Sequence, residues 1–91
     1  MAVVVIANTG KGTPEDMERW DKMMRDVLPT EPGFIIHANG LQADGTHRVV
    51  QLWESRELFQ AHFDKMVRPN LPADADDDGN EEFIEISNVI R

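Results

Sequence analysis

The feature that most constrains the fold of this chain is that its expected strands are apolar on both faces. Residues 2–8 read AVVVIAN, residues 34–36 are Phe-Ile-Ile, and residues 49–50 are Val-Val. A sheet with helices on one side and water on the other would alternate apolar and polar residues instead. Two helices cover one face only, so the pattern predicts a homodimer in which a second copy covers the other face.

The expected elements follow the order βαββαβ. Thr13 and Pro14 are typical of a helix start, and Ser55 of a second one, while Asp44-Gly45 is typical of a two-residue hairpin turn. The expected strands are 2–8, 34–38, 48–53 and 83–90, and the expected helices run from 14 to about 28 and from 56 to about 69. This order predicts one α+β domain over residues 1–91, a ferredoxin-like sandwich with a four-stranded antiparallel sheet.

Charge and composition exclude several function classes. The chain carries 17 acidic and 9 basic residues, a net charge of −8, which disfavours binding to nucleic acid. It has no cysteine, and its apolar run at residues 2–7 is far shorter than the roughly 18 residues that a membrane span needs. We therefore expect a cytoplasmic protein with no membrane partner.

An acidic loop at residues 72–82 follows the written calcium pattern of an EF-hand, from Asp74 to Glu85. Pro72 precedes the loop and an expected strand follows it, whereas an EF-hand has a helix on each side. The sequence thus favours a solvated loop over a calcium site. No histidine pair has the spacing of metal ligands, so no metal site is expected.

Three segments resemble the antibiotic biosynthesis monooxygenase family of the dimeric α/β-barrel superfamily. They are Glu31–His37 (EPGFIIH), Leu52–Ser55 (LWES) and Glu57–Phe63 (ELFQAHF). The resemblance implies two subunits paired sheet to sheet in a dimeric α/β barrel, with a pocket between the helices and sheet of each. It also implies a cofactor-independent monooxygenase that acts on a hydrophobic, aromatic or polyketide-like small molecule in antibiotic biosynthesis.

The chain departs from the patterns of this superfamily at two places. Its polyketide oxygenases place an Asn and a Trp four residues apart on the third strand; Trp53 matches the Trp, Val49 stands at the Asn position, and the chain has no Tyr. Its haem-degrading members bind iron through a histidine that would fall within residues 70–72, which are Asn-Leu-Pro. No cofactor is therefore expected. A non-redox cyclase or isomerase and a non-catalytic binding dimer remain alternatives.

Three residues are candidates for chemistry. His62 lies at the edge of the apolar stripe of the second helix, where it could transfer protons or simply pack in the core. Asn8 could orient a substrate carbonyl or end a strand, and Trp53 could stack on an aromatic ligand or fill the core. The expected pocket lining is Trp20, Met24, Phe34, Ile36, Gln51, Phe59 and Met66.

The register of the expected hairpin determines where the other two histidines, His37 and His47, lie. With a two-residue Asp44-Gly45 turn, Trp53 shares a face with Phe34 and Ile36, and His37 points to the opposite, dimer-facing side. His47 lies near the hairpin tip and is expected to be exposed. None of the three histidines has a carboxylate close enough in sequence to predict a catalytic pair.

Overall fold

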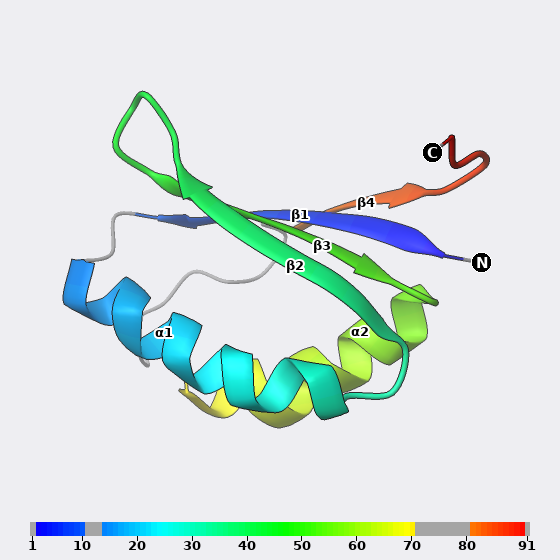
Figure 1. The fold of residues 1–91 in the computed structure, drawn as a ribbon, viewed down its shortest axis with the longest axis horizontal. Helices are drawn as coiled ribbons and strands as arrows, with labels where there is room; N and C mark the ends of the chain where they lie inside the picture. Colours follow the sequence, from blue (N-terminus) through cyan, green and yellow to red (C-terminus); the bar gives the residue numbers. More distant parts are fainter. Residues whose placement is uncertain (1, 11–13, 71–80, 91) are drawn as a thin grey trace.

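The computed structural model describes residues 2–10, 14–70 and 81–90, and two helices cover one face of a four-stranded sheet (Figure 1). The elements are β1 (Val3–Gly10), α1 (Pro14–Val27), β2 (Phe34–Leu41), β3 (His47–Trp53), α2 (Arg56–His62) and β4 (Glu81–Glu85). Short 3-10 turns at Leu28–Thr30 and Arg68–Asn70 and a π-helical segment at Phe63–Val67 complete the chain. All strand pairs are antiparallel, in the order β2-β3-β1-β4, which confirms the predicted fold class.

Local sequence signals explain where the helices begin. Pro14 is the first residue of α1, where its missing N–H is no loss. The hydroxyl of Ser55 accepts a hydrogen bond from the backbone N–H of Leu58 at 3.2 Å, so Ser55 is the N-cap of α2 as predicted. The last strand differs from the expectation: β4 ends at Glu85, and only the Ile86 N–H continues the pairing, to the Ala2 carbonyl.

The hairpin between β2 and β3 corrects the predicted register. Within the hairpin loop only Gly45 has a positive φ angle, of 87°, and its N–H donates to the Gln42 carbonyl, so three residues and not two form the loop. The strands are thereby shifted by one residue, and His37 pairs with Gln51. A second irregularity between Phe34 and Ile36 returns Phe34 to a position opposite Trp53.

The predicted faces of His37 and Ile36 were therefore wrong. His37 lies on the helix side of the sheet with Gln51, whereas Ile36 pairs with Leu52 and is 59% exposed. The cause is the alternation of side chains along a strand, because a shift by one residue exchanges the two faces.

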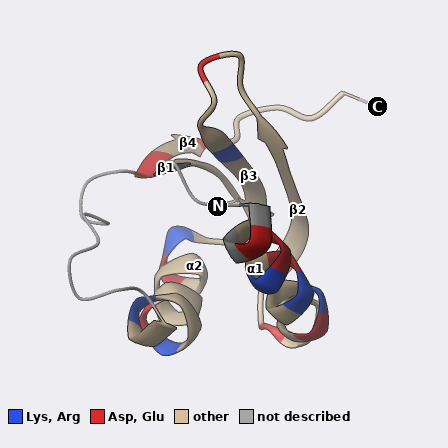
Figure 2. Ribbon diagram, turned by 90° about the vertical axis from the view of Figure 1, so that its left-hand side faces the viewer, with Lys and Arg blue, Asp and Glu red and all other residues tan. Residues whose placement is uncertain are grey.

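The core lies between the helix layer and the sheet. It consists of seven buried apolar residues: Val3, Val5, Met24, Leu28, Trp53, Phe59 and Phe63. Charged residues gather on α1 and α2 in Figure 2, while β1 and β2 contain none. The charged residues of the sheet lie on β3, which contains Arg48, and on β4, which contains Glu81, Glu82 and Glu85.

The outer face of the sheet carries apolar side chains that neither of the described helices covers (Figure 1). Val50 pairs with Ile6, and Val4 with Ile84, so these four residues share that face with Ile36. Ile36, Val50 and Ile84 are 59%, 43% and 51% exposed. The two-faced apolar pattern of the sequence therefore corresponds to one packed face and one open face.

Several expectations fall outside what the structure describes. The acidic loop at residues 72–82 lies outside the described residues except for its last two, so the calcium pattern is not addressed. Asn8 pairs with Arg48 in the sheet, but its side chain is outside the description. None of the described helices is long and apolar enough to cross a membrane.

The turn before β2 generates the first prediction. Gly33 has a φ angle of 82°, and a Cβ atom there would meet the Leu58 side chain, with its Cβ 3.0 Å away. Gly45 has a similar φ angle but open space around it. We expect Gly45→Ala to lower the free energy of unfolding by about 1–2 kcal/mol through backbone strain alone, and Gly33→Ala by about 1–3 kcal/mol more. Urea unfolding of both variants measures the difference, and equal losses would contradict the proposed contact with Leu58.

Candidate functional site

The centre of the candidate site is His62, the last residue of α2. Its ring is 1% exposed and lies over the indole of Trp53, with ring centroids 5.1 Å apart and planes tilted by 31°. Neither ring nitrogen has a hydrogen-bond partner among the described residues. Buried polar atoms are nearly always paired, so an imidazole with two unpaired nitrogens is a functional candidate.

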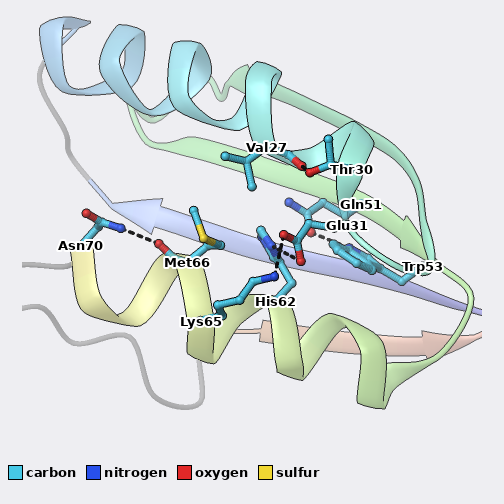
Figure 3. Close-up of polar contacts among 9 residues, drawn as sticks. All are labelled: Val27, Thr30, Glu31, Gln51, Trp53, His62, Lys65, Met66 and Asn70. Carbon is cyan, nitrogen blue, oxygen red and sulfur yellow. Dashed lines mark hydrogen bonds and ion pairs between the residues drawn. The ribbon is translucent and has the colours of Figure 1, made fainter.

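A carboxylate that the sequence analysis missed lies beside this imidazole. Glu31 Oε2 is 3.7 Å from His62 Nδ1, beyond hydrogen-bond length, and Glu31 Oε1 is 2.9 Å from the ammonium of Lys65 (Figure 3). The side chain of Glu31 is 7% exposed and that of Lys65 58%. The Glu31–Lys65 ion pair therefore joins the segment before β2 to the segment after α2, next to the buried imidazole.

The environment favours the neutral form of His62. Burial lowers the pKa of His62 below 6.5; the Glu31 carboxylate opposes this effect, and the ammonium of Lys65 adds to it. A neutral imidazole at neutral pH can accept a proton. If Glu31 closes on Nδ1, it holds the proton there and leaves Nε2 as the acceptor, the role that a carboxylate plays in a catalytic triad.

The backbone after His62 is irregular. Residues Phe63–Val67 form a π-helical segment, which contains Lys65, before the chain ends the helix at Arg68–Asn70. Such segments are rare and occur frequently at functional sites. Lys65 is placed by this segment three residues after His62, on the side from which Glu31 approaches.

A second group of polar side chains continues from Trp53 along the sheet. The indole N–H of Trp53 donates to Gln51 Oε1 at 2.8 Å, and Gln51 Nε2 lies 2.8 Å from His37 Nδ1. His37 Nε2 lies 3.1 Å from Asn39 Nδ2, which donates to Asp21 on α1 at 2.7 Å. Burial lowers the pKa of His37, while the Asp21 carboxylate opposes this effect.

This chain of contacts ends at a cleft between α1 and β2. The cleft has a volume of about 340 Å³, close to the lower limit of small-molecule sites. Its lining is Asp21, Met24, Arg25, Leu28, Pro29, Phe34, His37, Ala38 and Asn39. The cleft does not touch Trp53 or His62, so it is separate from the Glu31–His62 pair.

The expected pocket residues are thus divided among several places. Met24 and Phe34 line the cleft, whereas Gln51 and Phe59 are buried in the core beside Trp53. Trp20 packs against the core while partly exposed, and Met66 is likewise half-buried. Ile36 is on the opposite face, as described above. The sequence offered no signal for Glu31, Lys65 or the inward position of His37 because all three depend on contacts distant in sequence.

The described part of the chain contains no group of three or more His, Asp or Glu side chains arranged to bind a metal ion.

Comparisons with known proteins identify solved structures with a similar fold. Neither a protein-family model nor a curated protein sequence matches this chain. The crystal structure of the heme-degrading protein MhuD from Mycobacterium tuberculosis, in a heme-free form, superimposes with a TM-score of 0.65 at 25% identity over 100% of both chains. The structure of MhuD with two hemes bound in its active site superimposes with a TM-score of 0.63 at 19% identity, again over 100% of both chains.

A second neighbour is SnoaB, a cofactor-independent oxygenase from Streptomyces nogalater. It superimposes with a TM-score of 0.54 at 18% identity, over 71% of this chain and 68% of its own. Both neighbours have the α/β fold of the antibiotic biosynthesis monooxygenase-like superfamily. The predicted α+β fold of the single chain is therefore shown, whereas the pairing of two copies stays a prediction, and the neighbours are a heme-degrading protein and an oxygenase.

The buried imidazole predicts a pH dependence of stability. In the unfolded chain His62 takes up a proton as the pH falls below about 6.5, while burial keeps the folded chain neutral to lower pH. We expect the free energy of unfolding to fall between about pH 7 and pH 5, with a slope of at most about 1.4 kcal/mol per pH unit for this group. In His62→Phe this slope should decrease, leaving the similar contribution of His37.

Urea unfolding at a series of pH values measures this slope. The other charged groups beside the ring are Glu31 and Lys65. An unchanged slope in His62→Phe would show that His62 takes up protons equally in the folded and unfolded chain, and it would contradict the lowered pKa.

Proposed function

We propose that this chain is a cofactor-independent oxygenase that acts on an aromatic or polyketide-like small molecule, with His62 as the proton acceptor. The observation that carries the proposal is the buried, neutral imidazole with two unpaired nitrogens between Trp53 and Glu31. The likeness in fold to an oxygenase and a heme-degrading protein supports it. A role in antibiotic biosynthesis follows from the family resemblance alone.

The reaction needs a substrate with an acidic CH₂ group that is conjugated through an aromatic ring to a carbonyl, so that the carbonyl oxygen stabilises the carbanion. Nε2 of His62 removes the proton, and Glu31 stabilises the imidazolium that forms. The substrate carbanion gives one electron to O₂, and the two radicals combine to a hydroperoxide anion, which takes up a proton. Loss of the second C–H proton cleaves the O–O bond, so that CH₂ and O₂ become C=O and H₂O.

The Glu31–Lys65 ion pair controls access to His62. The imidazole is buried, and Lys65 is the exposed member of the pair beside it, so substrate approaches when this pair separates. Lys65 is 58% exposed, so its ammonium can return to water when the pair separates. We propose that Trp53, whose ring packs against His62, then contacts the aromatic part of the substrate.

Heme does not fit the described residues. An iron ligand needs a free imidazole lone pair that faces the heme, but the Nδ1 lone pair of His37 faces the Gln51 amide at 2.8 Å, and the cleft of about 340 Å³ does not reach His62. Asn70 stands where the resemblance placed part of the haem-ligand region, and residues 71–72 lie outside the described residues. No step of the proposed reaction therefore uses heme.

Oxygen consumption with 9(10H)-anthrone as the probe tests the proposal. We expect uptake above the spontaneous rate, one O₂ per anthraquinone formed, and a decrease of about 10²–10⁴-fold in His62→Phe, the usual contribution of a general base. Glu31→Gln should lower kcat more than it changes KM. The same substitution at the hairpin, His47→Phe, is the matched control and should leave the rate unchanged.

The outcome also separates the alternatives. If O₂ is not consumed but the CH₂ group exchanges its protons with deuterium under nitrogen in a His62-dependent manner, the non-redox cyclase or isomerase is correct. If neither occurs, the chain is a binding protein and the proposal is wrong.

The protein acts as a homodimer in which the open face of the sheet covers the same face of a second copy. The apolar residues Ile36, Val50 and Ile84 on this face support the pairing. Sedimentation at micromolar concentration should give a dimer, and Val50→Glu should give a monomer because it would bury a charge. Leu41→Glu is the control, since Leu41 is 68% exposed on the other side of β2. A monomeric wild type would refute the dimer.

A further inference from the structure

The hydrogen bonds that start at Trp53 have a fixed direction. An indole N–H can only donate, so the atom of Gln51 that faces it is the amide oxygen. The other end of the same amide, Nε2, is a donor and lies 2.8 Å from His37 Nδ1. Nδ1 of His37 therefore accepts, and the proton of the neutral ring is on Nε2.

The Nε2–H of His37 has no acceptor among the residues that the structure describes. Its neighbour at 3.1 Å is Asn39 Nδ2, which is also a donor. The Asn39 amide cannot rotate its oxygen into that position, because the same nitrogen donates to the Asp21 carboxylate at 2.7 Å and an oxygen there would face the carboxylate. One N–H on the wall of the cleft is thus left without an acceptor.

The rest of the cleft fits a small uncharged molecule. Met24, Leu28 and Phe34 supply apolar surface, while Asp21 and Arg25 are of opposite charge and offset each other. A full negative charge on the ligand would be repelled by Asp21 beside His37, whereas a carbonyl oxygen can accept the hydrogen bond without that repulsion. The lowered pKa of His37 agrees with a neutral donor.

The geometry points to a second ligand site in the cleft between α1 and β2, where His37 Nε2–H donates to the carbonyl oxygen of a small uncharged ketone. This site goes beyond the proposed oxygenase reaction and does not depend on it, because His62 does not line the cleft. The ligand would be connected through Gln51 to the indole of Trp53, so binding should be detected at that N–H.

Binding is measured with two probes of the same shape, 1-tetralone and tetralin, which lacks the carbonyl. Chemical-shift titration of the ¹⁵N-labelled full chain should show 1-tetralone binding about 5–10-fold more tightly, the contribution of one hydrogen bond to a neutral acceptor. The Trp53 indole resonance should shift with 1-tetralone. His37→Phe should abolish the preference, and His47→Phe, the matched control, should retain it.

Equal affinity for the two probes, no binding of either, or an unchanged preference in His37→Phe would overturn the proposal. A second measurement needs no variant. Long-range ¹H–¹⁵N spectra of the unmodified chain at pH 7.5 should show His37 as the neutral Nε2–H tautomer, and an Nδ1–H tautomer would overturn the proposal even if His37→Phe does not fold.

Discussion

The burial of Trp53 is the constraint on which the rest of the structure depends. The side chain is fully buried, and the rings of Phe34, Phe59 and His62 pack around it at centroid distances of 5.5, 5.9 and 5.1 Å. An indole buried this deeply has to satisfy its N–H, and Gln51 does so from two residues earlier on the same strand. Gln51 is buried for this reason, and its second amide atom determines the orientation of His37. The burial of Trp53 thus determines, through Gln51, which nitrogen of His37 accepts a hydrogen bond.

The sequence was sufficient for the architecture but not for the faces of β2. Strand and helix signals such as Pro14 and Ser55 act locally, so they can be recognised without tertiary information. The length of the hairpin loop cannot be recognised in this way, because the dipeptide Asp44-Gly45 suits both a two-residue loop and a three-residue loop in which only Gly45 has a positive φ angle. The choice between them is a shift of one residue, and it exchanges the positions of Ile36 and His37. A second irregularity near Ile35 restores Phe34 to the core, which no local signal indicates.

The candidate site shows the same limit. His62 could be selected from sequence as a polar residue beside an apolar stripe, but its carboxylate partner could not, since Glu31 belongs to a turn that reaches the helix only in the folded chain. Gly33 makes this approach possible. Its positive φ angle turns the chain two residues after Glu31, and its missing side chain leaves room for Leu58 of α2. The turn between α1 and β2 therefore also brings the carboxylate to the imidazole.

The unpaired nitrogens of His62 are unfavourable for stability, and this is the strongest reason to regard the residue as functional. Leaving a buried polar atom unpaired costs about 1–3 kcal/mol, and the imidazole has two such atoms. A phenylalanine could make the same ring contact with Trp53 at no such cost, as Phe34 and Phe59 already do. Glu31 could have paired with Nδ1 but is held at 3.7 Å, with its other oxygen on Lys65. This arrangement keeps the neutral imidazole of His62 next to a carboxylate that can approach it. The missing hydrogen bond that lowers the stability of the core therefore leaves His62 ready to accept a proton.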